Sequence, residues 1–169
     1  MFSKRLTARA LFGRGIFIGV AGGLAEVVVV YVYTALTGGD AAVVGRGVAE
    51  AVGLPDASAW VGLAVHMGLA ASLGTGLYAL FSMMHGSSGL GRSTRFMLGS
   101  LTAVWAFNFF VLLPVLSPGF VHVLPYAVTL ASKLAFGLAA AGMTQFHLPA
   151  GRFWSLQVAH RTCLATVGE

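Results

Sequence analysis

Four polar side chains interrupt otherwise apolar stretches of this 169-residue chain: Glu26, His66, Asn108 and Lys133. Ionisable residues inside membrane-spanning segments are costly, and they usually face protein or water rather than lipid. A carboxylate, an imidazole and an ammonium group held together could relay a proton or an ion through an apolar layer. They could instead form a structural cluster in which Glu26 pairs with Lys133, because an unpaired buried charge is expensive. A third possibility is that some of them bind a neighbouring subunit.

Haem and metal ligation are the other chemistries that histidines suggest. Membrane cytochromes ligate haem with histidines from facing helices, but only His66 lies well inside an apolar run, and His122 lies near the end of one. We therefore expect no haem. His160 and Cys163 have too few neighbouring ligands to predict a metal site. The chain also has no phosphate-binding glycine loop, nucleophile elbow or HExxH motif, so we predict no catalytic residue, no metal, no cofactor and no enzyme.

The composition predicts the class of protein that positions these residues. Hydrophobic residues make up 57% of the chain and charged residues 9%, whereas a soluble domain carries about 25% charged residues. A chain of this size could not hide so much apolar surface from water, so we predict an integral membrane protein with bound lipids. Lipid leaves backbone groups no external partner, which predicts an all-α four-transmembrane-helix bundle. The predicted spans are 15–36, 59–83, 96–116 and 124–146.

Loop charges predict the orientation of these spans. Lys and Arg precede the first span, lie between the second and third, and follow the fourth. The two remaining loops hold a single Arg beside three acidic residues. Positive charge stays on the cytoplasmic side, which also explains the net charge of +5 better than nucleic-acid binding does. We predict a multi-pass protein of the bacterial inner membrane with both termini cytoplasmic.

Three further segments complete the predicted organisation. They are a basic cytoplasmic segment over residues 1–14, a periplasmic helix over 41–53 that rests on the bilayer, and an interfacial cytoplasmic tail over 147–169. Counting ~1.5 Å per residue along the spans then places the four polar side chains in a narrow band near the membrane midplane.

Small residues recur in steps of four along the spans, which places them on one face of each helix. Such stripes let helix backbones approach closely in a membrane. In spans two and four a basic residue is followed by two small ones, and spans one and three each carry an Arg ahead of a Gly. The chain therefore has the pattern of two related helical hairpins. The residues predicted to pack helices together are Gly15, Gly19, Gly23, Ala70, Gly74, Gly99, Ala103, Gly137 and Ala141.

The second span carries a recognisable spacing, in which Trp60 is followed by His66 and then by Ala70, Gly74 and Tyr78. This pattern resembles the YagU-like family of small bacterial inner-membrane proteins of unknown function, and the glycine-rich first span is similar as well. The resemblance covers about half of the chain, and the large middle insertion of some members is absent. It implies an inner-membrane location and a helical bundle, and it supplies no catalytic residues.

Three functions fit these observations, and the sequence places them in order. The first is a non-catalytic accessory subunit of a multi-subunit membrane complex, respiratory or photosynthetic, whose partners are other membrane-protein subunits and lipids. The second is a small transporter or proton-conducting protein that uses Glu26, His66 and Lys133. The third is a haem-binding membrane anchor.

Overall fold

The computed structural model describes residues 8–85 and 89–146, and all of their regular structure is helical. Four helical segments are long and apolar enough to cross a membrane, as predicted. They are α1 (Ala8–Thr37), α3 (Ala59–His85), the run from α4 (Leu90–Phe107) to Leu116, and α6 (Tyr126–Gln145). The predicted tail over 147–169 and most of the predicted segment over 1–14 lie outside the described residues.

Two helices begin earlier than the hydropathy pattern predicts. The first span starts at Ala8 rather than residue 15, and the third at Leu90 rather than residue 96. Both additions are rich in arginine, which is a good helix former. Apolar length alone therefore underestimates these helices, because a helix can continue beyond its apolar segment.

The third span changes its helical form before it ends. After α4 the chain forms a π-helical turn, η1 (Asn108–Leu112), and then the short α5 (Leu113–Leu116). The N–H of Leu113 bonds the carbonyl of Asn108, which is the five-residue step of a π-helix. Pro114 follows directly, and its missing N–H and bulky ring disturb the regular ladder at this point.

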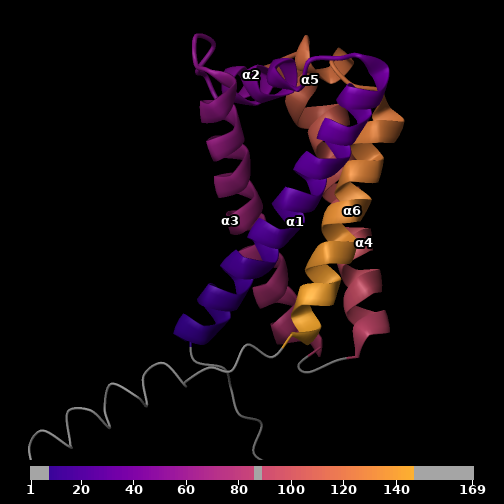
Figure 1. Ribbon diagram of the computed structural model, residues 1–169. Coiled ribbons are helices and arrows are strands. Elements are labelled where there is room, and N and C mark those ends of the chain that lie inside the picture. The colour runs from indigo at the N-terminus through magenta and orange to yellow at the C-terminus, as the bar shows by residue number, and fades with distance from the viewer. Residues whose placement is uncertain (1–7, 86–88, 147–169) are drawn as a thin grey trace, which may run out of the picture.

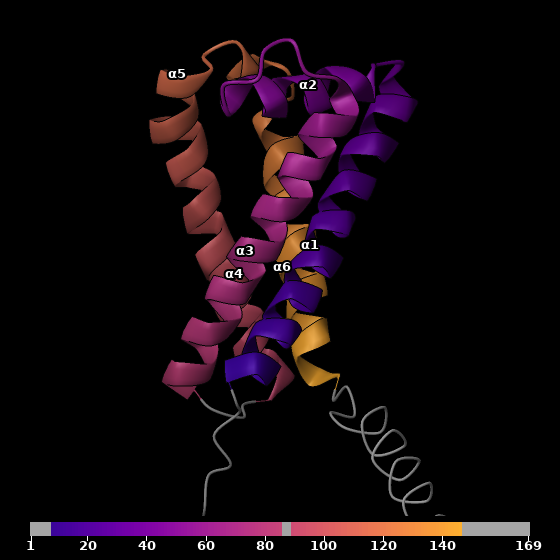
Figure 2. The same cartoon turned by 90° about the vertical axis from the view of Figure 1, so that its left-hand side faces the viewer.

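A short helix, α2 (Ala41–Ala51), covers one end of the long helices. Figures 1 and 2 show it lying across their ends. The Asp40 side chain caps it by accepting a hydrogen bond from the Ala42 N–H at 2.8 Å. Gly38 and Gly53, with φ values of +70° and +84°, allow the turns on either side. The predicted helix over 41–53 is thus two residues shorter in the structure, because the chain turns after Ala51.

The long helices pack in the order α3, α1, α6, α4, without closing into a ring. Helix α1 packs against both α3 and α6, and α4 packs against α6. Helices α3 and α4 contact each other little, at the end where residues 86–89 join them. There the Phe96 ring lies 5.4 Å from the Phe81 ring. Figure 2 shows α3 and α4 diverging from this point toward α2 and α5.

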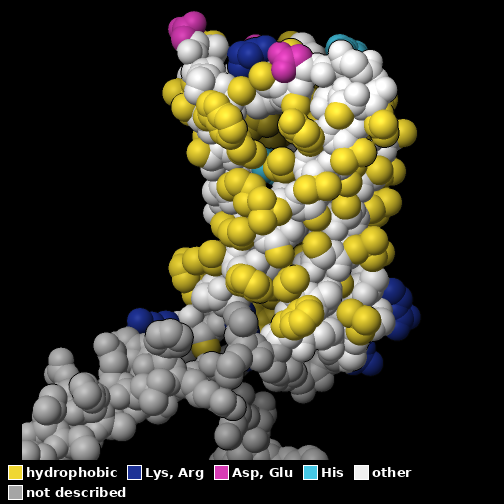
Figure 3. Space-filling model, viewed as in Figure 1, with side chains coloured by type: hydrophobic (Ala, Val, Ile, Leu, Met, Phe, Trp, Pro, Cys, Tyr) yellow, Lys and Arg dark blue, Asp and Glu magenta, His cyan; other side chains and the backbone are white. Residues whose placement is uncertain are grey.

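Charge divides the molecule into two ends, which we call the arginine end and the α2 end. The arginine end carries Arg9, Arg14, Arg92 and Arg95, and the α2 end carries Asp40, Arg46, Glu50 and Asp56. Figure 3 shows Lys and Arg side chains near the lower end, acidic side chains beside a basic one at the upper end, and hydrophobic side chains between the two ends. Among the described residues, the only charged ones between the two ends are the largely buried Glu26 and Lys133, so the band between the ends is the part that suits a membrane interior.

The apolar core occupies the arginine half of the bundle. Its largest fully buried side chains are Phe136, Met97 and Leu101, which come from α6 and α4. Residues of α1 and α3, including Ile18 and Phe81, complete this cluster. Toward the α2 end, buried polar residues on α1 and α6 take over. They are Glu26, Thr34, Thr129 and Ser132. Apolar packing thus holds the helices together in the arginine half, and in the other half buried polar contacts join apolar ones such as that of Phe109.

Candidate functional site

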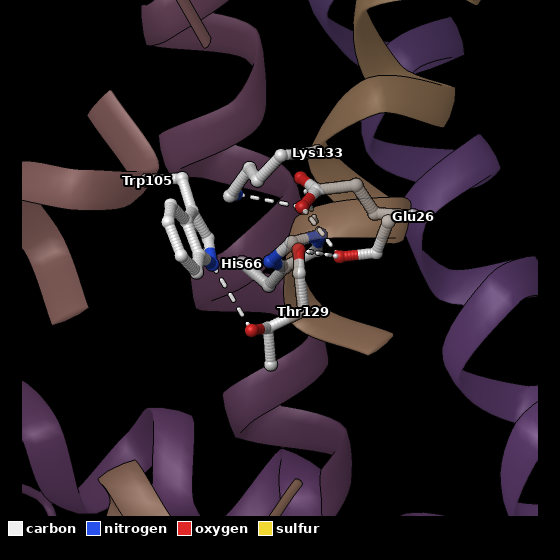
Figure 4. Close-up of polar contacts among 6 residues, drawn as sticks. Glu26, His66, Trp105, Thr129 and Lys133 are labelled. Atoms are coloured by element: carbon white, nitrogen blue, oxygen red, sulfur yellow. Dashed lines mark hydrogen bonds and ion pairs between the residues drawn. The ribbon is translucent and has the colours of Figure 1, made fainter. Parts of the chain in front are cut away.

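A buried ion pair joins α1 to α6 where the apolar core ends. The Glu26 side chain, 4% exposed, lies with Oε1 2.6 Å from Lys133 Nζ (Figure 4). Ser132 Oγ lies 3.4 Å from the same oxygen, but it also donates to the Thr129 carbonyl at 2.8 Å. Because a hydroxyl has one hydrogen, Lys133 is the main partner of the carboxylate. The two opposite charges offset the cost of burying either one.

His66 approaches the same carboxylate from α3. Its Nε2 atom lies 3.8 Å from Glu26 Oε2, which is too long for a hydrogen bond. Among the described residues, this buried nitrogen has no hydrogen-bond partner. A buried polar atom without a partner is uncommon in a folded protein, and it marks a place where a proton or a water can act. One carboxylate therefore faces two basic side chains, and only Lys133 is bonded to it.

A second polar contact lies one helical turn from Lys133 and joins α4 to α6. Trp105 Nε1 donates to Thr129 Oγ1 at 3.0 Å, and Thr129 Oγ1 in turn donates to the Tyr126 carbonyl at 3.0 Å (Figure 4). Phe109, Phe110 and Tyr126 surround the Trp105 ring at centroid distances of 5.5–6.4 Å. The sequence analysis missed this contact. The available indications were a buried indole N–H that needs an acceptor and the place of Thr129 four residues before Lys133.

Asn108 does not join the cluster, contrary to the prediction. It is half-buried at the first residue of the π-helical turn, and its side chain makes no hydrogen bond within the described part of the chain. The reason is the packing order, because α4 packs against α6 while Glu26 lies on α1. A similar depth along their helices accompanies the contacts of Glu26, His66 and Lys133, but Asn108 at a similar depth lies on a different side of the bundle.

Small residues determine how closely α1 approaches α3. A Cβ atom added to Gly19 would lie 2.7 Å from Ala71 Cα, and one added to Gly15 would lie 2.5 Å from Thr75 Cα. Gly23 faces Ala70, and Gly74 faces the Gly19 backbone. The predicted packing residues on these two helices therefore lie at one crossing. This close approach brings His66 within reach of a carboxylate on α1.

The packing residues on α6 and α4 behave differently from one another. A Cβ added to Gly137 would lie 2.9 Å from Leu98 Cδ2, and Ala141 is buried. In contrast, a Cβ added to Gly99 would have no neighbour within 4 Å in the described chain, and Ala103 is exposed. The prediction that Gly99 and Ala103 pack helices within this chain is therefore wrong, because α4 turns a different face toward α6.

Several packing glycines were not predicted from the sequence, among them Gly22 of α1. Gly22 lies beneath the Phe136 ring, and a Cβ at this position would be 2.5 Å from two of its carbon atoms. Gly22 is three residues from Gly19 and faces α6 rather than α3. Helix α1 thus carries small residues toward both of its neighbours, which allows Glu26 to meet side chains from each of them.

The cluster is more open toward the α2 end than toward the arginine end. The His66 and Lys133 side chains are 24% and 16% exposed, against 6% for Glu26. Figure 3 shows a hollow on this face below α2, between α3 and α1. The apolar core lies on the other side of the cluster.

Comparisons of the chain with protein-family models, with curated proteins and with solved structures find no match.

Proposed function

We propose that the chain is a multi-pass protein of the bacterial inner membrane whose four long helices form one bundle. In this proposal the arginine end faces the cytoplasm and the α2 end faces the periplasm. The distribution of Lys and Arg between the two ends supports this orientation, because basic residues are retained on the cytoplasmic side. The stretch of apolar residues along each long helix supports membrane insertion.

For this membrane protein we infer a transport function in which Glu26, Lys133 and His66 bind and release a proton. The observation that carries the inference is the buried His66 Nε2 atom, which lies 3.8 Å from a carboxylate already paired with Lys133. The geometry thus favours the second of the functions that the sequence suggested. An ionisable group inside a membrane-spanning segment is in general a sign of function.

The contacts suggest how a proton would act. A neutral imidazole with its hydrogen on Nδ1 presents a lone pair at Nε2, which can take up a proton. The resulting cation would close its distance to Glu26 Oε2, since charge-assisted hydrogen bonds are short and strong. Lys133 would then share the Glu26 carboxylate with a second cation, and the ion pair that joins Lys133 to Glu26 of α1 would weaken. Protonation of His66 therefore shifts the ionic contacts of Glu26 on α1 from Lys133 of α6 toward His66 of α3.

The test is proton flux into proteoliposomes that contain a pH-sensitive dye, driven by an imposed membrane potential. The double variant Glu26→Gln/Lys133→Met and the single variant His66→Gln are expected to lose flux at least about tenfold. His122→Gln is the matched control, since His122 is an exposed residue near the α2 end. Wild-type flux no higher than that of empty vesicles would refute transport. Undiminished flux in the double variant would exclude this cluster as the site.

An accessory subunit is the second candidate, supported by the uncovered face of α4. Gly99 and Ala103 form a small-residue surface without a neighbour in the described chain. Such a surface suits close contact with a transmembrane helix of another subunit. Affinity purification after cross-linking in membranes tests this candidate. Gly99→Leu/Ala103→Leu should release a co-purifying subunit, whereas the control Gly76→Leu, also without a neighbour within 4 Å, should retain it.

A further inference from the structure

A recess at the arginine end lies between α1, α3 and α6, away from the polar cluster. The residues that line it are Arg14, Phe17 and Ile18 of α1, Tyr78 of α3, Met143 and Thr144 of α6, and Phe146 just after α6. Its lining combines a cation and two hydroxyl groups with four apolar side chains. This combination resembles neither an apolar packing defect nor an open water-filled surface.

Arg14 lacks an acidic partner within the described residues. Its Nη1 atom donates to the Tyr78 hydroxyl oxygen at 3.4 Å, and Tyr78 itself is 6% exposed. The acidic residues of the described chain lie elsewhere, with Glu26 in the cluster and the others at the α2 end. The remaining guanidinium N–H groups and the Tyr78 hydroxyl hydrogen can therefore donate to an anion in the recess.

We propose that this recess binds the phosphate headgroup of an anionic phospholipid. Arg14 supplies the charge and a fork of donors that matches phosphate oxygens, and Tyr78 supplies one further donor. Basic pockets between transmembrane helices on the cytoplasmic side hold anionic headgroups in this way. The inference rests on the membrane location and orientation proposed above, and it adds a ligand site that the transport proposal does not need.

The apolar wall of the recess favours a lipid over free phosphate. Phe17 is 45% exposed on the outside of α1, next to the buried Ile18. The surface on which the glycerol and the upper acyl chain would lie is thus continuous with the lipid-facing surface of the helix. A free phosphate ion would use the two donors and gain nothing from this wall.

Native mass spectrometry of the delipidated full-length protein tests the proposal. Phosphatidylglycerol is titrated into detergent micelles, with phosphatidylcholine as the neutral comparison. Arg14→Gln is expected to raise the Kd for phosphatidylglycerol about tenfold or more, and Tyr78→Phe about fivefold. Tyr78→Phe keeps the ring, so it provides a second measurement if Arg14→Gln folds poorly.

Arg95→Gln is the matched control, because it removes the same charge from the same end at a residue outside the recess. Arg95 Nε donates to the Gly91 carbonyl of its own helix. The Kd of the Arg95→Gln variant for phosphatidylglycerol should stay within about twofold of the wild-type value. An equal loss in both arginine variants would show general attraction and overturn the proposal. Equal affinity for phosphatidylcholine, or displacement of the lipid by millimolar inorganic phosphate, would also overturn it. Binding is measured without a proton gradient, so failure of the transport proposal would leave this result interpretable.

Discussion

Separating the Glu26–Lys133 ion pair is the most direct perturbation of the cluster. Lys133→Met removes the ammonium group and leaves a buried carboxylate whose nearest polar atoms are Ser132 Oγ at 3.4 Å and His66 Nε2 at 3.8 Å. Glu26→Gln leaves the Lys133 ammonium group without its anionic partner. Breaking a buried pair by removing one partner costs about 3–5 kcal/mol. Each single variant is expected to lose about that much free energy of unfolding.

The double variant Glu26→Gln/Lys133→Met should behave differently from the sum of its parts. It carries neither charge, and neutral side chains of similar volume replace both partners, so its stability should lie within about 1 kcal/mol of wild type or above it. The large difference between the double variant and the two singles is the coupling energy of the pair. It is also why the double variant serves in the flux experiment, where loss of transport must not reflect loss of folding.

Unfolding in mixed micelles with increasing SDS, followed by tryptophan fluorescence, measures these free energies. Arg46→Gln is the control, because its pair with Asp40 is exposed and its removal should cost less than about 1 kcal/mol. Additive losses in the double variant would refute the ion pair. Single losses as small as that of the control would show that water reaches both charges.

Three further predictions concern the packing and the caps. Gly19→Ala should cost about 1–3 kcal/mol of unfolding free energy because its Cβ meets the α3 backbone, whereas Gly99→Ala should be neutral or stabilising, both measured by the same SDS titration. Trp105→Phe should cost about 1 kcal/mol through the lost bond to Thr129, with less fluorescence change on unfolding. Asp40→Ala should cost about 1 kcal/mol and Asp40→Asn much less, seen as hydrogen exchange at the start of α2.

Hydropathy predicts which segments form the long helices, because lipid permits the backbone few alternatives. It does not predict which helices become neighbours. The structure places α1 between α3 and α6, and this order follows from glycines on two faces of α1, of which only the face with Gly15, Gly19 and Gly23 was recognised. The stripe at Gly99 and Ala103 has the same spacing without a partner in the described part of the chain. Small-residue spacing shows that a helix can pack closely, but it does not show which helix becomes its partner.

The residues of the candidate site could be predicted from sequence insofar as they lie at a similar depth along their helices. Glu26, His66 and Lys133 were singled out because each interrupts an apolar run at a similar depth, and the structure brings their side chains together. The same criterion gave a wrong prediction for Asn108. Depth along a helix carries no information about how that helix is rotated or which helices are its neighbours in the bundle. The Trp105–Thr129 bond was missed for a related reason, since both residues are compatible with ordinary interfacial or packing roles.

The position of the cluster suggests which part of the protein would move. Toward the arginine end, α1, α3, α4 and α6 share one apolar core, and a closely packed core resists rearrangement. Toward the α2 end, α3 and α4 diverge, and the Glu26–Lys133 pair joins α1 to α6 beyond the apolar core. A charge gained at His66 would therefore act where the helices are least constrained. The packed half would serve as the fixed end, and the α2 half would change its spacing.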